Sequence, residues 1–590
     1  MRWGHREGAK RSRPILKDFI DPVIEAKLGG YVKNLYNLYI YFWRWALWKV
    51  LEQNEGQKAG VVSLVTAASY LDGDAFVGMR QHIRKICDEI WILDLGGEGR
   101  GTRPDENIFD NVQIPVAIAV AFRRGALDSS KPAKVRYASV RGSRAKKISF
   151  LKRIRDFKDI EWKDCPQGWQ EPFRPEGEGR YFRWPLLTDL LPWQHSGVQF
   201  QRTWPISSDQ ETLQRRWETL LVSSDRAELF KETRDRKINA TYKPIFDAIE
   251  EKKSIAELPE NTPPPCIKRY GYRSFDRKWA FIDSRLGDYL RPVFWYTHSE
   301  KQVYLVSLLS HPLGSGPAIT VSSLPPDLNY FRGSFGGKNV MPLYRTADGK
   351  IANIPPKLLK LLSQTYRRTV TAEDLIAYIY AVLAQPLFTS LFYEELGTCE
   401  IRLPITKDRL LFNEMQKIGE KLLWLHTFGE RYQSKNKKHI PQGIARCTKP
   451  VPSDPSGYPE SFEFDEVDCT LNVGQGKFQP VRREVFDFEV SGLKVVQSWL
   501  AYRMKEGRGR RSSALDDIRP KYWTSQSTTE LLELLWVLEA TLEIYSEQAE
   551  LLETVVKEKC FRAEDLPPVP ASMRRAPASP GALLEREPYR

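Results

Sequence analysis

Apolar side chains dominate one early segment of the chain, residues 34–53, which reads NLYNLYIYFWRWALWKVLEQ. Its longest unbroken apolar run, Leu38 to Trp43, is far shorter than the ~20 residues that span a membrane. On a helix, the polar side chains of this region fall on one narrow stripe surrounded by apolar ones, and they are Lys33, Asn37, Tyr41 and Arg44. We therefore predict a helix buried in a soluble core, with one edge facing solvent or a cleft.

The following segments alternate between strand and helix patterns. Apolar runs at Val61–Val65, in EIWILDL (89–95) and in IPVAIAVAF (114–122) each predict a buried strand. Between the first two runs, AFVGMRQHIRKICDEI has apolar residues at helical spacing and predicts an amphipathic helix. This order is typical of an α/β sheet with helices on its faces. Because no helix separates the last two strands, we predict that they are antiparallel neighbours.

After about residue 125 the sequence becomes rich in basic residues. KVRYASVRGSRAKKISFLKRIRDFK predicts a strand followed by a basic helix, and ELPENTPPPC (257–266) is typical of a linker. Short strand-like runs (VYLVSLL, AITVSSL) and several helical segments follow, and the Pro/Arg/Ala-rich tail predicts disorder. We therefore divide the chain into 1–125, a connecting basic segment 126–256, a region 257–560, and a disordered tail 561–590.

The charge balance favours a polyanionic partner. The chain has 590 residues and a net charge of +14, with 41% hydrophobic residues, and its mean hydropathy is -0.46. Contacts to phosphates would supply sequence-independent affinity for such a chain. The seven cysteines are scattered without C-x-x-C spacing, which argues against zinc sites and a disulfide framework, and no secretion signal is evident. We expect a cytoplasmic protein with no bound metal and no association with membranes.

Two glycine-rich stretches do not have the spacing of nucleotide-binding motifs. The loop Gly96–Gly101 is followed by TRPDENIF, which lacks the helical periodicity that a dinucleotide fingerprint requires. GSFGGKN (333–339) does not match the phosphate-binding loop of nucleoside triphosphatases. The chain therefore carries no recognisable ATPase motor.

Longer blocks of sequence carry a resemblance to a known family. GVVSLVTAASYLDGDAFVGMRQHIRKICDEIWILDLGGEGRGT and ENIFDNVQIPVAIAVAFRR resemble the back half of the catalytic domain of adenine-specific DNA methyltransferases. RWPLLTDLLPWQHSGVQFQRTWPI, IKRYGYRSFDRKW, LWLHTFGERY and VVQSWLAYRMKEGRGRRSSALDDIRPKYW are similar to blocks of the C-terminal specificity region of type ISP restriction-modification enzymes. The resemblance extends to about residue 555.

The resemblance implies a fold of class α/β: an incomplete Rossmann-like methyltransferase sheet consisting of the last three strands, followed by a mixed α+β target-recognition region. It also implies N6 methylation of a flipped-out adenine by S-adenosylmethionine. Phe109 matches an aromatic that stacks on the target base in that family. The alternative for Phe109 is a hydrophobic plug that closes its loop.

The chain also departs from the family pattern. It contains neither an Asn-Pro-Pro-Tyr motif nor a Phe-x-Gly-x-Gly cofactor loop, and the helicase and nuclease regions are absent. We therefore expect S-adenosylmethionine to serve the complete enzyme, with none bound by this chain alone and no methyl transfer by it. A separately encoded N-terminal methyltransferase half is a candidate partner.

The leading hypothesis is recognition of a specific double-stranded DNA sequence as part of such a methyltransferase. The alternative is a stand-alone DNA-binding specificity protein without catalytic activity; a nuclease finds little support. His195 and His426 are interpreted as structural hydrogen bonders. Candidates for DNA contacts are the clustered basic residues Arg100, Arg103, Arg141, Arg144, Lys146, Lys147, Arg153, Arg273, Arg277, Arg508, Arg510 and Arg511.

Overall fold

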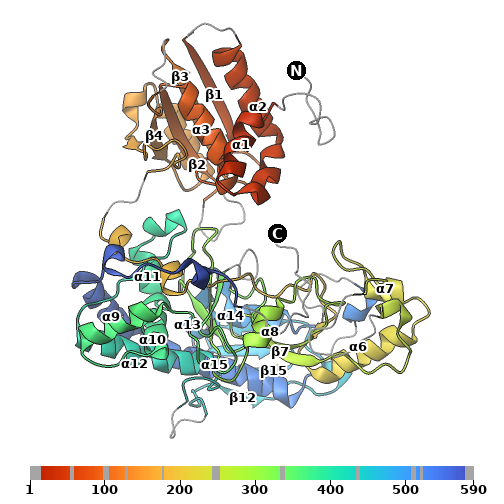
Figure 1. The fold of residues 1–590 in the computed structure, drawn as a ribbon. Coiled ribbons are helices and arrows are strands. Elements are labelled where there is room, and N and C mark those ends of the chain that lie inside the picture. Colours follow the sequence, from red (N-terminus) through yellow and green to blue (C-terminus); the bar gives the residue numbers. More distant parts are fainter. Residues whose placement is uncertain are drawn as a thin grey trace. The chain divides into compact units, whose positions relative to one another are not determined.

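The computed structural model consists of two compact units, a first that ends at Glu178 and a second that begins at Gly179 (Figure 1). The structure describes residues 15–53, 59–97, 105–125, 130–175, 179–241, 253–331, 339–433, 439–505, 513–517 and 522–577. Both units mix helices with small sheets, which confirms the predicted α/β class.

The first unit is built on a five-stranded sheet in the order β1-β3-β2-β4-β5. The strands are β1 (Gly60–Ala67), β2 (Glu89–Gly96), β3 (Val116–Arg123), β4 (Lys134–Ser139) and β5 (Lys163–Asp164). The three predicted strands are β1, β2 and β3, and the prediction that β2 and β3 are antiparallel neighbours is confirmed. β3 also pairs antiparallel with β1, while β4 runs parallel to β2. The boundary predicted at residue 125 therefore falls inside this sheet.

Helices cover the two faces of this sheet unequally. On one face, α1 (Lys17–Glu25), α2 (Leu38–Leu47) and α3 (Val77–Ile86) bury a core with the inward residues of β1, β2 and β3. On the other face, α4 (Arg144–Arg153) covers the ends of β2 and β4. Val61 and Val65, which point to that second face from β1, remain 61% and 50% exposed. Among the described strands, β1 is an edge of the sheet.

The segment 34–53 is helical, but its burial differs from the prediction. It consists of the end of a 3₁₀ helix (Gly29–Tyr36), then α2, then a short π-helix (Trp48–Glu52). Arg44, predicted on the solvent stripe, is buried because it forms ion pairs with Asp18 and Glu52. The exposed stripe is instead apolar, with Leu38, Phe42 and Trp45 at 71%, 54% and 43% exposure.

The second unit packs its helices around two separate cores, a large one and a smaller one that includes Trp217 and Phe230. Its helices are α5 (Leu187–Leu190), α6 (Gln210–Val222), α7 (Arg226–Phe230), α8 (Pro292–Thr297), α9 (Pro356–Tyr366), α10 (Ala372–Leu383), α11 (Pro386–Leu391), α12 (Arg409–His426), α13 (Arg483–Phe486), α14 (Val495–Ala501) and α15 (Ser525–Lys557). Every residue of α10 from Leu375 to Leu383 is buried. The predicted helical segments near 372–388, 408–428 and 528–556 are confirmed as α10 with α11, α12 and α15.

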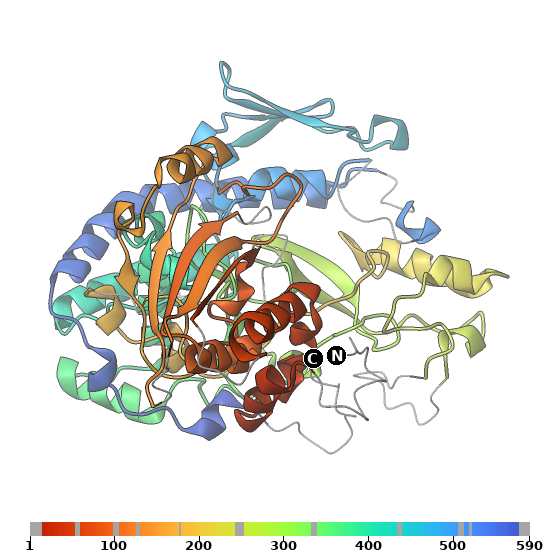
Figure 2. The same cartoon turned by 90° about the horizontal axis from the view of Figure 1, so that it is seen from above.

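Four small sheets attach to this helical core. They have the orders β6-β8-β7, β10-β9-β11, β12-β15-β14-β13 and β16-β17. Their strands are β6 (Ile206–Ser207), β7 (Ile267–Arg273), β8 (Asp276–Phe281), β9 (Tyr304–Ser307), β10 (Thr320–Ser322), β11 (Asn339–Pro342), β12 (Arg446–Lys449), β13 (Phe462–Asp465), β14 (Thr470–Val473), β15 (Gly476–Gln479), β16 (Glu489–Val490) and β17 (Leu493–Lys494). In Figure 2 the β12-β15-β14-β13 sheet projects from the helices of this unit.

Two segments predicted as a linker and a disordered tail are packed. In 257–266, the Trp217 indole of α6 donates to the carbonyl of Thr262 over 2.9 Å, so the boundary predicted at 256–257 falls inside the second unit. In the tail up to residue 577, Arg345 donates to the carbonyls of Met573 and Arg575, and Arg574 pairs with Asp189. No helix in the described ranges combines the length and apolar character needed to cross a bilayer.

Candidate nucleic-acid interface

The loop that carries Phe109 is fixed to the end of β2 by side-chain hydrogen bonds. Asp105 accepts from the Gly97 amide over 2.7 Å, and Asn107 donates to the carbonyls of Gly97 and Ile114, both over 2.9 Å. The Phe109 amide in turn donates to Asn107 Oδ1 over 3.0 Å. The Phe109 ring is 49% exposed, which leaves a face available for stacking; its role on a target base stays a prediction.

Asp94 forms the buried centre beneath this loop. Its carboxylate accepts from Arg141 over 2.8 Å, from Tyr137 over 2.8 Å and from Arg174 over 3.1 Å. Burial raises the pKa of Asp94, but the two guanidinium groups and the Gly96 amide outweigh it and hold the pKa below its usual value. Arg141 therefore has a structural role, although 44% of its side chain is exposed.

The predicted basic helix is α4, and its cations differ in accessibility. Lys146 and Arg153 are exposed, and Arg144, whose side chain is 40% exposed, pairs with Asp110. Lys147 is fully buried: its Nζ lies 2.6 Å from Asp105 Oδ1 and donates to the carbonyl of Glu106. The assignment of Lys147 to DNA contact is wrong for this conformation, because its charge is already neutralised inside the protein.

The two arginines predicted from RYGYRSFDRKW are also bound internally. Arg273 is buried, donates to Asp327 over 2.8 Å and lies 4.1 Å over the ring of Tyr272. Arg277 pairs with Glu430 over 3.0 Å and with Glu533 over 3.3 Å, with only 14% of its side chain exposed. Both assignments to DNA contact are corrected, because these guanidiniums are already paired with carboxylates of other segments: Asp327, Glu430 and, on α15, Glu533.

Five further candidates lie outside the described residues. Two of them come shortly after β2 in the sequence, Arg100 and Arg103, and three come after α14, Arg508, Arg510 and Arg511. They stay predictions.

The glycines at the end of β2 make internal hydrogen bonds. The amide of Gly96 donates to Asp94 Oδ1 over 2.9 Å, and that of Gly97 donates to Asp105. The expectation that this chain alone binds no S-adenosylmethionine stays a prediction. Within the described ranges, no cluster of His, Cys, Asp or Glu residues is arranged to hold a metal ion, and none of the seven cysteines forms a disulfide there.

His426 and His195 act as structural hydrogen bonders, as predicted. His426 is buried, with the Tyr380 hydroxyl 2.6 Å from Nδ1 and the Thr541 hydroxyl 2.8 Å from Nε2. Burial lowers the pKa of His426 to about 3, so the ring is neutral. His195 Nδ1 lies 3.1 Å from the carbonyl of Ser196.

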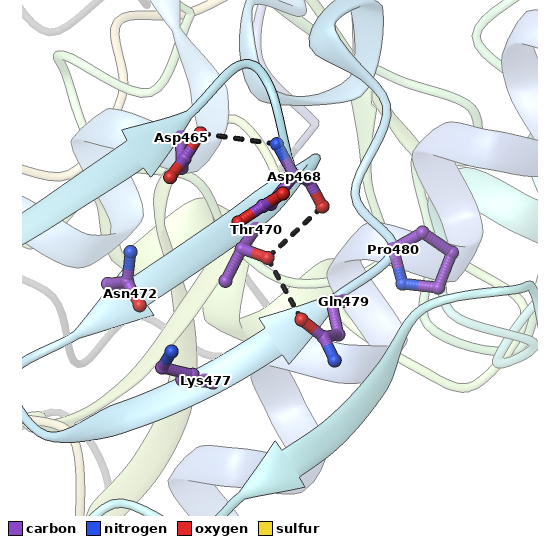
Figure 3. Close-up of a pocket in the computed structure, with 7 residues that line it drawn as sticks. All are labelled: Asp465, Asp468, Thr470, Asn472, Lys477, Gln479 and Pro480. Atoms are coloured by element: carbon purple, nitrogen blue, oxygen red, sulfur yellow. Dashed lines mark hydrogen bonds between the residues drawn. The ribbon is translucent and has the colours of Figure 1, made fainter.

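Sequence reasoning overlooked one polar surface, on β14 and β15. Thr470, Asn472, Lys477 and Gln479 line a hollow of about 380 Å³ together with Asp465 and Asp468 (Figure 3). Their signal was present in FEFDEVDCTLNVGQGKFQ, where apolar and polar residues alternate with the period of a strand.

Comparison with known proteins identifies the family. The profile of the type ISP C-terminal specificity domain matches residues 189–534, more than half of the chain, whereas no curated protein matches. Among solved structures, a DrdV–DNA complex is 18% identical with a TM-score of 0.61 and covers 90% of this chain. The ATP-dependent type ISP enzyme LlaBIII bound to DNA is 16% identical with a TM-score of 0.62 and covers 95%.

A nuclease-deletion mutant of the type ISP enzyme LlaGI, in complex with a DNA substrate mimic, is 18% identical with a TM-score of 0.57 over 90% of this chain. The present chain spans only 54%, 36% and 42% of the DrdV, LlaBIII and LlaGI chains, respectively. The similarity to these three structures shows a shared fold, and the match to the profile shows the family of the chain. The chain belongs to the family of the type ISP C-terminal specificity domain.

Proposed function

We propose that the chain recognises a specific sequence in double-stranded DNA, as the specificity part of an adenine-N6 DNA methyltransferase of a restriction-modification system. The observation that carries this proposal is the match of the specificity-domain profile over residues 189–534. The DNA-bound states of DrdV, LlaBIII and LlaGI and the net charge of +14 support it.

In this proposal some of the described cations contact DNA directly, and others act indirectly by holding the fold. Exposed Lys146 and Arg153 on α4 are suited to phosphates, which fix register without reading sequence. Arg273, Arg277 and Lys147 contribute indirectly, because their buried ion pairs hold the β7–β8 hairpin and the Phe109 loop in place. A binding surface on a rigid framework loses less conformational entropy when DNA docks.

In this proposal the first unit is the end of a Rossmann-like methyltransferase sheet. Further strands, in the same polypeptide or in a separately encoded half, would pair with the open edge of β1 and cover Leu38, Phe42 and Trp45. S-adenosylmethionine would bind the part that carries the Phe-x-Gly-x-Gly cofactor loop, a motif that does not occur in this sequence. Phe109 would then be available to stack on a flipped adenine.

DNA binding is tested by measuring affinity for duplex DNA across a salt series. We expect log K to fall linearly with log salt, with a slope of about -0.9 per phosphate contacted. Lys146→Ala should make the slope shallower by about 1. A flat response to salt would contradict the proposal.

The catalytic part is tested separately with labelled S-adenosylmethionine. We expect methyl transfer only when a polypeptide with the cofactor loop and an Asn-Pro-Pro-Tyr motif is present. Transfer by this chain alone would contradict the assignment of the catalytic motif to another part. If this chain binds DNA specifically and no added polypeptide restores methyl transfer, the results favour the alternative, a stand-alone specificity protein.

A further inference from the structure

The β12-β15-β14-β13 sheet has one apolar and one polar face. Leu471 pairs with Phe478 across β14 and β15, and both are fully buried in the core of the second unit. The next pair along the same strands, Asn472 and Lys477, points to the opposite face. The burial of Leu471 and Phe478 therefore fixes Asn472 and Lys477 on the outer face, where Lys477 is exposed and Asn472 is partly exposed.

The apolar face is anchored to helices. Glu539 of α15 accepts from the amides of Ile444 and Ala445, over 2.7 and 3.3 Å, just before β12 begins. On β13, Phe464 stacks on Phe486 of α13 with ring centroids 4.6 Å apart. The backbone that presents the polar face is therefore rigid, which favours precise placement of its side chains.

The polar side chains of the central strands are arranged in two rows (Figure 3). In one row, the Thr470 hydroxyl donates to Gln479 Oε1 over 2.9 Å, which leaves the Gln479 amino group to face outward. In the other row, no described residue forms a hydrogen bond or ion pair with the side chain of Asn472 or Lys477. The rows lie about 7 Å apart along the strand, roughly two base-pair steps.

The charges around the hollow favour base edges over phosphates. Asp465, Asp468 and Lys477 all line it, so two carboxylates outnumber the one cation. Asp465 has a local role as well, since it accepts from the amides of Val467 and Asp468 over 2.9 and 3.2 Å. A mixture of donors and acceptors matches the pattern that base pairs present in the major groove.

We propose that β14 and β15 place this face in the major groove of the target DNA, where Asn472, Lys477 and Gln479 read base edges. The inference rests on the proposed function and assigns it a site. The groove is about 12 Å wide, so it can admit the two central strands, while the flanking strands β12 and β13 would lie over its walls. An asparagine can bond adenine N6 and N7, a lysine can bond guanine O6 and N7, and the outward amino group of Gln479 requires an acceptor such as N7.

The experiment selects binding sites from a pool of randomised DNA duplexes and sequences them, using the full chain. Asn472→Ala and Gln479→Ala are compared with the wild type and with Gln364→Ala and Lys357→Ala, which remove exposed side chains of α9. Each sheet variant should lose preference at one or two adjacent positions of the selected motif, with discrimination there falling about 5- to 100-fold. Affinity for unrelated duplex and its salt slope should stay unchanged, and the α9 variants should select the wild-type motif.

Asn472→Asp keeps the shape of the side chain but replaces its amino donor, so it should change the preferred base rather than only weaken the preference. Wild-type motifs from all three sheet variants would overturn the inference while leaving the proposed function intact. A uniform loss of affinity with a shallower salt slope would also overturn it, because that result indicates phosphate contacts. If the wild type itself bound no DNA, both proposals would fail.

Discussion

At the scale of single residues, the neighbouring lysines of α4 have opposite environments. Lys147 is fully buried against Asp105, whereas Lys146 is exposed. We expect Lys147→Met to lower the free energy of opening of the surrounding sheet by about 3 kcal/mol, because it removes the cation nearest to Asp105 and leaves only Arg141, 4.0 Å away. Lys146→Met should change it by less than about 0.5 kcal/mol. Hydrogen exchange of the β2 and β4 amides measures both; equal effects would contradict the buried ion pair.

A second prediction concerns pH. His426 is neutral when folded, with a pKa lowered to about 3 by burial, whereas an unfolded histidine titrates near pH 6.5. Between about pH 6.5 and 3 only the unfolded state binds this proton, so the contribution of His426 to stability is complete above pH 6.5 and is lost as pH falls. Each pKa unit corresponds to about 1.4 kcal/mol.

The test is thermal unfolding of the full chain from pH 7 to 4. His426→Gln should reduce the acid-induced fall in the unfolding temperature, whereas the same change at exposed His439 should leave it unaltered. An identical pH dependence in wild type and His426→Gln would show that other groups cause acid unfolding.

The candidate site was only partly predictable at this scale. The sequence reveals where cations cluster, but Arg273, Arg277 and Lys147 meet carboxylates 54, 153 and 42 positions away. Periodicity carries no information about such distant partners. It does identify Asn472 and Gln479 as outward residues of strands, because the alternation around them is local.

At the scale of elements, α10 and α12 approach each other through Gly419. A Cβ on Gly419 would overlap the carbonyl of Ala377, and overpacking of this kind costs about 1–3 kcal/mol or more. We expect Gly419→Ala to lower the free energy of unfolding by about 3 kcal/mol. Lys417→Ala, on the exposed side of α12, should be nearly neutral, and denaturant titration compares the two.

The elements themselves were well predicted wherever a pattern was long. The three strands of the first sheet and the helices α10, α12 and α15 follow directly from apolar spacing. The outward face of α2 was not predictable, because a helix that is apolar nearly all round does not reveal which side packs. Arg44 was misplaced for the same reason, since its partner Asp18 lies on another helix.

At the scale of the whole molecule, the exposed apolar stripe of α2 predicts association. A polypeptide that supplies the upstream methyltransferase strands should bind this chain and raise its unfolding temperature. Phe42→Glu should weaken that complex, because it places a charge among Leu38 and Trp45.

The matched control is Leu391→Glu, which charges an exposed leucine of α11 in the other unit. Co-purification and light scattering measure the complex. Equal binding by Phe42→Glu and the wild type would show that α2 does not contact the added strands.

Residues near the beginning of the second unit contact residues near the end of its described part. Arg180, at its beginning, donates to the carbonyls of Val556 and Lys557 at the end of α15, over 2.6 and 3.1 Å. Arg574 likewise pairs with Asp189. A domain that is entered and left at one place can be transplanted as a single cassette, since the chain of a new host need not be rerouted. We therefore predict that the second unit keeps its fold when it is inserted as one segment into another protein.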